Sequence, residues 1–254
     1  MKRRNSIALA LAAGLLLTAA TSAFGGIARI DADAELRLGR EIDKWVHKTR
    51  KFARNWGYQE RIDRIGHAVA GAADPEGRYT WRFQISNEPH RNMAASCAGY
   101  VYITRGMMAA GFGDDELAGA MAHEMVHIMK QHVAKSYMVE YAALEFNDKV
   151  VDRAVQDLNM MRHGAAGPFQ VFNYGRRKME RDFEREADSL GVHYAAEAGF
   201  DPMGHARLLK ILLGNREAPT DLRKILLLSH PPSSERIKRI ETEARRVSGK
   251  SDEG

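Results

Sequence analysis

The sequence predicts an α+β protein in which helices dominate and the β-sheet is small. Three observations lead to this prediction. Most of the chain carries apolar residues at helical spacing. Only residues 79–86, with Trp81, Phe83 and Ile85 alternating along one side, and residues 100–104 read as strands. Finally, 44% of the 254 residues are hydrophobic, which is enough to build the core of one ordinary domain.

The remaining elements are expected to be helices joined by short connections. The segment 87–99 between the two strands reads as a loop or an irregular edge strand. Asp114 is the expected N-cap of the longest helix, because acidic residues follow it in the first turn. The apolar periodicity predicts helices over residues 33–56, 58–70, 114 to about 141, 176–198, 203–213 and 233 to about 245.

The N-terminus has the three parts of a secretory signal peptide. Basic residues come first, an apolar run from Ile7 to Ala20 follows, and small residues surround Ala23. Cleavage after Ala23 would remove residues 1–23, leave 24–254 as a single domain, and predict a periplasmic protein. The alternative is an uncleaved anchor in the inner membrane, since no charge occurs from Ser6 through Ala28.

Charge and cysteine content narrow the functional classes. Three of the charges behind the formal net charge of +5 belong to Lys2, Arg3 and Arg4, so the rest of the chain carries little net charge. This balance gives no reason to expect a nucleic-acid partner. Cys97 is the single cysteine, so an internal disulfide is excluded and stability has to come from the core, with a bound metal as an optional further source.

A metal-binding pattern occupies residues 123–127, which read His-Glu-Met-Val-His inside the longest expected helix. His123 and His127 are little more than one turn apart, so both imidazoles leave the same face. Two neutral imidazoles and a carboxylate suit zinc, with one position open for water. Glu124 is placed to act as general base. The competing interpretation is a surface helix, but apolar neighbours such as Met125 favour buried histidines, which need a partner.

The identity of the third metal ligand distinguishes subclasses of the proteins that carry this histidine pattern. An extended pattern with a glycine and a third histidine is excluded, because Lys130 and Val133 occupy those positions. His132 follows His127 by five residues, which on a continuous helix turns it about 140° away from the metal.

Acidic residues further along the chain offer a carboxylate. Glu184 and Asp188 are four residues apart and share a helix face, whereas Glu186 points away. Glu184 could be the third ligand, with Asp188 accepting a hydrogen bond from the outer nitrogen of a ligating histidine. The alternative, favoured by these residues alone, is an exposed acidic helix paired with nearby arginines.

These residues resemble the zinc metallopeptidase family that includes HtpX and the CAAX prenyl endopeptidases. The resemblance covers residues 35 to 242 and is carried by four specific segments, namely 123–127, 184–191, 199–202 and 229–237. It implies a mainly helical, zincin-type fold in which the edge strand of a small sheet faces the active-site helix. It also implies that Glu184 is the third zinc ligand, that Asp188 supports the ligands, and that His230 and Arg236 help to stabilise the transition state.

The family also has an edge strand that pairs with substrate. Its pattern aligns with residues 92–99, so Asn92, Ala94, Ala95 and Ser96 are the expected substrate-binding residues. Cys97 stands where the family has proline and Ala98 where it has glycine, which leaves the sequence preference open. Without spanning helices beyond the N-terminus, the chain resembles the soluble, periplasmic BepA-like branch of the family.

The predicted function is zinc-dependent endopeptidase activity on exported or misfolded envelope proteins, in protein quality control. Zinc would activate a water molecule, and Glu124 would act as general base. One Zn²⁺ is expected per chain, with unfolded or misfolded polypeptides as substrates. Membrane association through an uncleaved N-terminus, or through the outer-membrane assembly machinery, is a further expectation.

Two questions of regulation stay open at this level. His230 could close the free coordination site and keep the enzyme latent, and residues 158–175 read either as a lid or as a connector. The rival to an active protease is a zinc-containing periplasmic chaperone or assembly factor with latent or residual activity.

Overall fold

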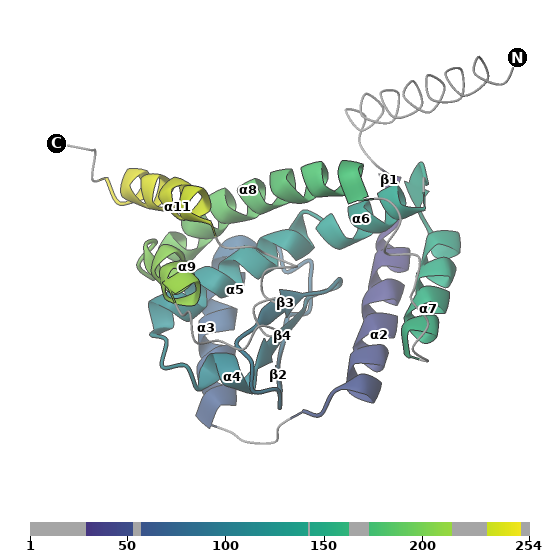
Figure 1. The fold of residues 1–254 in the computed structure, drawn as a ribbon, viewed down its shortest axis with the longest axis horizontal. Helices are drawn as coiled ribbons and strands as arrows, with labels where there is room; N and C mark the ends of the chain where they lie inside the picture. The colour runs from purple at the N-terminus through teal and green to yellow at the C-terminus, as the bar shows by residue number, and fades with distance from the viewer. Residues whose placement is uncertain (1–28, 53–56, 142, 163–172, 215–232, 250–254) are drawn as a thin grey trace, which may run out of the picture.

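The computed structural model describes residues 29–52, 57–141, 143–162, 173–214 and 233–249. Helices far outnumber strands in these segments, which confirms the predicted α+β class (Figure 1). The elements are β1 (Arg29–Ile30), α2 (Ala32–Thr49), α3 (Gly57–Ala73), β2 (Arg82–Ser86), β3 (Met93–Ala95), β4 (Tyr100–Thr104), α4 (Arg105–Met108), α5 (Asp114–Met129), α6 (His132–Glu140), β5 (Glu145–Phe146), α7 (Asp148–Arg162), α8 (Asn173–Glu197), α9 (Gly204–Gly214) and α11 (Ser234–Val247).

The main sheet has three strands in the order β2-β4-β3. Strand β4 lies in the middle, parallel to β2 and antiparallel to β3. Four of the five residues of β4 are apolar or aromatic, as expected for an interior strand. Within the described residues β3 has a partner on one side only, so the segment 87–99 contains the edge strand that was one of its two interpretations. A second, two-stranded sheet pairs β1 with β5.

Helix α5 is the centre of the fold. It contacts α3, α8, α9 and strand β3, and Figure 1 shows it crossing beneath the long helix α8. A helix that carries apolar or small residues on every side has to be covered on every side. The twelve consecutive residues 117–128 of α5 are buried, including both histidines of the predicted metal motif. The motif therefore lies in the core and not on an exposed helix.

The helix predicted from residue 114 to about 141 is broken into two, which corrects the sequence prediction. Helix α5 ends at Met129, Gln131 adopts a left-handed backbone conformation with φ of 54°, and α6 starts at His132. The N-cap prediction is also wrong. Gly113 is the N-cap, and its N–H donates to a carboxylate oxygen of Glu116 at 2.8 Å.

The helix predicted over 33–56 is shorter than expected. It ends at Thr49, because the backbone of Arg50 is extended. Strand pair β1–β5 and helix α7 were not predicted at all. Strands of two residues carry no readable alternation, and α7 follows a segment that was assigned to the end of the longest helix.

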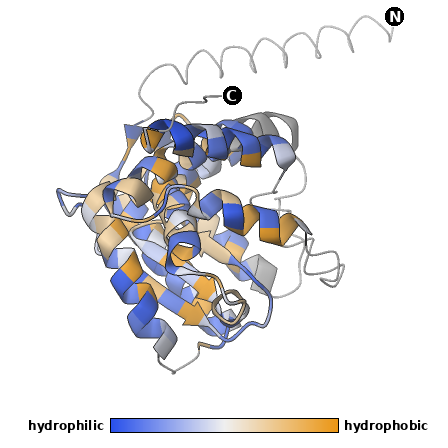
Figure 2. Cartoon of the chain, turned by 90° about the vertical axis from the view of Figure 1, so that its left-hand side faces the viewer, coloured by the Kyte–Doolittle hydropathy of each residue, from blue (hydrophilic) through white to orange (hydrophobic). Residues whose placement is uncertain are grey.

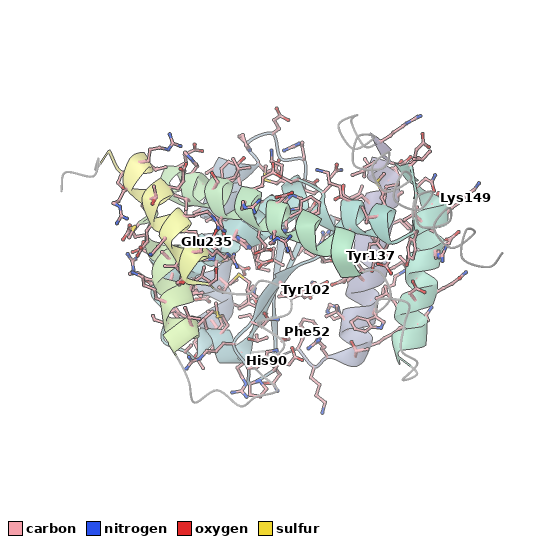
Figure 3. The ribbon with its side chains drawn as sticks, turned by 45° about the horizontal axis from the view of Figure 1, so that its top comes forward. Phe52, His90, Tyr102, Tyr137, Lys149 and Glu235 are labelled. Carbon is pink, nitrogen blue, oxygen red and sulfur yellow. The ribbon has the colours of Figure 1, made fainter. Side chains whose placement is uncertain are left out.

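A second apolar cluster lies on the far side of the sheet from α5. It joins α2, α6 and α7 to the loop before β4, and it includes Leu38, Cys97 and Phe146. Tyr102 of β4 donates a hydrogen bond to Asp43 of α2 at 2.9 Å, which ties the sheet to this helix. Figure 3 shows Tyr102 and Phe52 between the sheet and α2. The thiol of Cys97 is buried in this cluster, and burial raises its pKa.

Colouring by hydropathy shows how the helices are used (Figure 2). Individual helices carry hydrophilic and hydrophobic patches side by side, as expected when one face is buried. Within the described residues, no helix combines the length and the apolar character needed to cross a membrane. The predicted signal peptide, residues 1–23, lies outside the described residues, and the single domain over 24–254 stays a prediction.

Candidate metal centre

The predicted ligands meet between α5 and α8. The Nε2 atoms of His123 and His127 are 3.2 Å apart. A carboxylate oxygen of Glu184 lies 3.6 Å from Nε2 of His123, and the other lies 3.3 Å from Nε2 of His127. Ligands placed tetrahedrally around zinc, at bonds of about 2.0–2.2 Å, are about 3.3 Å from one another. The three side chains therefore fit a tetrahedral ion with a fourth position open.

The two helices can approach this closely because α8 has a glycine at the contact. A Cβ atom on Gly191 would lie only 3.0 Å from the backbone nitrogen of His123. Ala187, one turn before Gly191, is also fully buried. Small residues on this face of α8 thus set the spacing that brings Glu184 to the histidines.

His123 is held from behind by two charged residues. Its Nδ1 atom lies 3.1 Å from an oxygen of Asp188, as predicted for the supporting carboxylate. Arg236 donates two hydrogen bonds to Asp188, from Nε at 2.8 Å and from Nη2 at 2.7 Å, and its Nη1 atom lies 3.1 Å from Glu184. All of these side chains are almost completely buried, with Glu184 the most exposed at 13%.

Burial and charge set the protonation states of this group. Burial holds the pKa of His123 well below its usual value, so its imidazole is neutral and keeps a lone pair for a metal. Burial opposes the charge of Arg236, but the hydrogen bonds to Asp188 and the attraction of both carboxylates outweigh it. The pKa of Arg236 is therefore raised, and the guanidinium stays charged.

A second group of possible ligands shares His123. His123, Asp188 and His205 also bring ligand atoms close together. Both carboxylate oxygens of Asp188, however, accept hydrogen bonds from Arg236. In Glu184 the guanidinium lies beside Oε2, whereas Oε1 is 3.3 Å from Nε2 of His127. The group formed with His127 and Glu184 is therefore the better metal site.

Glu124 lies between the metal ligands and the sheet. The backbone N–H of Ala95 in β3 donates to its Oε2 atom at 2.7 Å. The edge strand thus faces the helix that carries both histidines, as the family resemblance implied. The carboxylate of Glu124 is buried, with 4% of the residue exposed.

The hydrogen bonds of β3 show which backbone groups face away from the sheet. The carbonyl of Asn92 accepts from the N–H of Thr104, and the N–H of Ser96 donates to the carbonyl of Tyr100, both at 3.0 Å. Asn92 and Ser96 therefore direct these backbone groups towards β4. The side chain of Ser96 is also buried.

The alternation of an antiparallel ladder extends this pattern to the residues between them. Ala94 is in register with Tyr102, so its backbone groups also face β4. Those of Met93 and Ala95 face the open edge. Of the four residues predicted to bind substrate, Ala95 is the one whose N–H is directed towards Glu124. Met93 was not predicted and contributes the neighbouring outward position.

His132 is absent from both groups of possible metal ligands, as predicted, but the continuous helix assumed for that prediction is wrong. The break at Gln131 folds α6 back, so that Nδ1 of His132 lies 2.9 Å from Nδ1 of His127. On its other side, Nε2 of His132 lies 3.1 Å from an oxygen of Glu186. Burial lowers the pKa of His132 to about 2. No sequence signal marks this contact, since Gln131 is not a residue type that favours a left-handed conformation.

Three other residues singled out in the sequence are His230, Cys97 and Arg236. His230 lies outside the described residues, as do residues 163–172 of the segment interpreted as a lid or a connector. Cys97 belongs to the apolar cluster beside α2 and to neither group of possible metal ligands. Arg236 is buried behind the ligands, and its contact with a transition state stays a prediction.

A site for a Lewis-acidic ion, a carboxylate beside it and an open strand edge together provide the chemistry of a metallopeptidase. The sequence model of peptidase family M48 matches residues 58–244, which is most of the chain. The chain belongs to peptidase family M48. This confirms the resemblance inferred from the four sequence segments.

Curated relatives in the same family are similar at low identity. A Vibrio cholerae protein, provisionally named a beta-barrel assembly-enhancing protease, is 29% identical over 219 residues, which cover 81% of this chain and 43% of the relative. The mitochondrial metalloendopeptidase OMA1 of Schizosaccharomyces pombe is 27% identical over 185 residues, 72% of this chain and 51% of the relative. The beta-barrel assembly-enhancing protease of Yersinia pestis is 22% identical over 217 residues, 83% and 44% respectively. The chain thus matches about half the length of these relatives.

Proposed function

We propose that the chain is a zinc-dependent endopeptidase that cleaves extended, unfolded polypeptides, with one zinc ion per chain. The observation that supports this most directly is the spacing of the three ligand atoms, 3.2–3.6 Å, beside Glu124. A zinc ion bound there would polarise the scissile carbonyl and acidify water. Every other step is performed by the residues of the chain.

Glu124 would act as general base. One of its carboxylate oxygens would take a proton from the attacking water and pass it to the nitrogen of the leaving amine. Burial restricts the motion of this side chain, and its bond to Ala95 fixes the direction of the carboxylate. Such a positioned base avoids the cost of reorganisation during the reaction.

The edge of β3 would bind the substrate as an additional strand. The N–H and carbonyl of Met93 and the carbonyl of Ala95 face outwards, and an extended peptide can pair with them without regard to its side chains. The N–H of Ala95 stays bonded to Glu124. Binding of this kind selects unfolded segments and tolerates many sequences. Asn92, Ala94 and Ser96 would support this edge by holding β3 against β4.

Two residues implied by the resemblance complete the proposed site. His230 would assist the developing oxyanion, or close the free coordination position in a latent state. Arg236 would act through the carboxylates it binds, Asp188 and Glu184, and keep the ligands in place.

The proposed setting is the periplasm, with export through residues 1–23. Envelope proteins that are misfolded or wait for assembly would be the substrates. Two of the relatives described above are named for enhancing beta-barrel assembly, which supports this setting. Expression of the whole chain in a Gram-negative host tests it. A mature N-terminus at Phe24 in the periplasmic fraction is expected, and an intact N-terminus in the cytoplasm would contradict it.

The decisive experiment compares the parent with Glu124→Gln, measuring bound zinc and cleavage of casein. The glutamine oxygen can still accept from Ala95, so the fold and the zinc content should be unchanged. We expect one zinc per chain in both proteins and cleavage by the parent alone. Removal of the metal by a chelator should abolish cleavage, and added zinc should restore it.

Three other results of the zinc and casein measurements would contradict parts of this proposal. Equal cleavage by both proteins would eliminate Glu124 as the base. Zinc in both proteins without cleavage in either would favour the chaperone or assembly factor, or a latent protease that His230→Ala would activate. Absence of zinc from the parent would overturn the metal site itself.

A further inference from the structure

His127 has a neighbour that neither the sequence pattern nor the catalytic roles account for. Gln131 breaks the helix, so His132 starts a new one and its ring returns to the ring of His127. The two Nδ1 atoms are 2.9 Å apart, and the rings meet nearly edge to face at 4.9 Å between centroids. Only 2% of His132 is exposed. A polar ring buried at this depth needs a defined hydrogen-bonding role.

The hydrogen bonds around the two rings can be assigned a single direction. His127 offers its Nε2 atom to the metal site, so in the neutral ring the proton is on Nδ1. This N–H donates to Nδ1 of His132, which must then carry no proton. The proton of His132 is therefore on Nε2, which donates to Oε2 of Glu186 at 3.1 Å. Each contact then has one donor and one acceptor.

We propose that His132 is a positioning residue for the metal centre. It would fix the orientation and tautomer of His127 by accepting the Nδ1–H bond, and Glu186 would fix the tautomer of His132 in turn. Outer partners of this kind typically change metal affinity by about 10- to 100-fold when they are removed. The inference rests on the proposed zinc site, and it adds a relay of imidazole and carboxylate behind the second histidine ligand.

The competing explanation is packing. The ring of His132 is stacked on Phe183 of α8, with centroids 3.9 Å apart and an interplanar angle of 10°. A purely structural role would need the flat ring and not the acceptor. Two substitutions separate these explanations. His132→Phe keeps a flat ring and loses the acceptor, whereas His132→Asn loses the ring but keeps an acceptor atom bonded to Cγ, where Nδ1 stands.

The experiment measures zinc affinity by competition with a chelator in the full chain. We expect His132→Phe to bind zinc about 10- to 100-fold more weakly than the parent, with His132→Asn closer to the parent. The visible absorption of the cobalt-substituted protein should change more in the phenylalanine variant, because the orientation of His127 is then less restrained. Parental affinity in His132→Phe, or equal losses in both variants, would overturn the proposal.

A second pair of variants keeps the test valid if a change at the buried His132 impairs folding. Glu186 is 40% exposed at its side chain, so Glu186→Ala should fold normally. We expect it to weaken zinc binding several-fold, with Glu197→Ala on the exposed end of the same helix as a control of parental affinity. Equal affinity in these two variants would remove Glu186 from the relay. Failure of the parent itself to bind zinc would instead refute the proposed function.

Discussion

The two histidines of the candidate centre are supported in different ways. Behind His123 stand a carboxylate and a guanidinium, Asp188 and Arg236, both almost completely buried. Behind His127 stands a second imidazole, His132, whose outer partner Glu186 is partly exposed to solvent. Both arrangements offer an acceptor to the outer nitrogen of a ligand, one with buried charge and the other with a neutral ring.

The two supports differ in how much the stability of the protein depends on buried charge. A buried ion pair is costly to form, and it is costlier to break, because one charge is then left without its partner. Removing a neutral ring leaves no buried charge without a partner. We therefore expect the His123 side to influence folding as well as metal binding, and the His127 side to influence chiefly metal binding.

The largest effect should come from neutralising Asp188. Asp188→Asn removes the charge of the carboxylate that accepts hydrogen bonds from the buried Arg236, so we expect the metal-free protein to lose about 3 kcal/mol of stability. Urea denaturation of the full chain measures this. A loss below about 1 kcal/mol would show that the two sides do not differ in the way described.

A double-mutant cycle measures how much of this loss comes from the ion pair between Asp188 and Arg236. Arg236→Met removes the buried cation, so in its presence Asp188→Asn should cost much less than in the parent. We expect a coupling of about 2 kcal/mol between the two positions. Additive losses, measured by the same denaturation, would mean that the ion pair contributes little beyond its packing.

The helix break that positions His132 can be tested through its backbone. A β-branched residue is strained at positive φ, whereas glycine is not. Gln131→Val should therefore be less stable than Gln131→Gly by about 1–2 kcal/mol. Both variants lose the same amide side chain, so the comparison isolates the backbone, and equal stabilities would argue that the left-handed conformation is not maintained in solution.

The smallest effect should come from the outer acid on the His127 side. Glu186→Gln makes the same acid-to-amide change as Asp188→Asn, at a residue whose side chain is 40% exposed. Exposed ion pairs contribute at most about 1 kcal/mol, and we expect less than about 0.5 kcal/mol here in the metal-free protein. A loss as large as that of Asp188→Asn would abolish the contrast.

The two sides also differ in how far the sequence predicts them. Glu184 and Asp188 are one turn apart on an unbroken helix, so the helical period places both on one face, and the family resemblance directs that face to the metal. The α+β class follows equally directly, because long periodic segments are the most readable features of a sequence. These parts of the site and fold depend on local regularity.

The His127 side depends on a departure from regularity. Extending the helix to residue 141 placed His132 about 140° round the helix from His127, and one residue in a left-handed conformation instead brings its ring to Nδ1 of His127. Lys130 and Gln131 carry no glycine or proline signal. The outward position of Met93 was missed for a related reason. The ladder that decides which groups of β3 face outwards depends on its pairing with β4.

The bond between Gln131 and Glu35 has a consequence for where this domain can be cut. The amide of Gln131 donates to the carboxylate of Glu35 in α2 at 2.7 Å, and Glu35 is itself buried. Helix α2 precedes residue 58, where the match to the family begins. A fragment that starts there keeps His123, His127 and Glu184 but exposes the junction that carries His132. We therefore expect the smallest stable unit to begin before residue 58, N-terminal to the shared family segment.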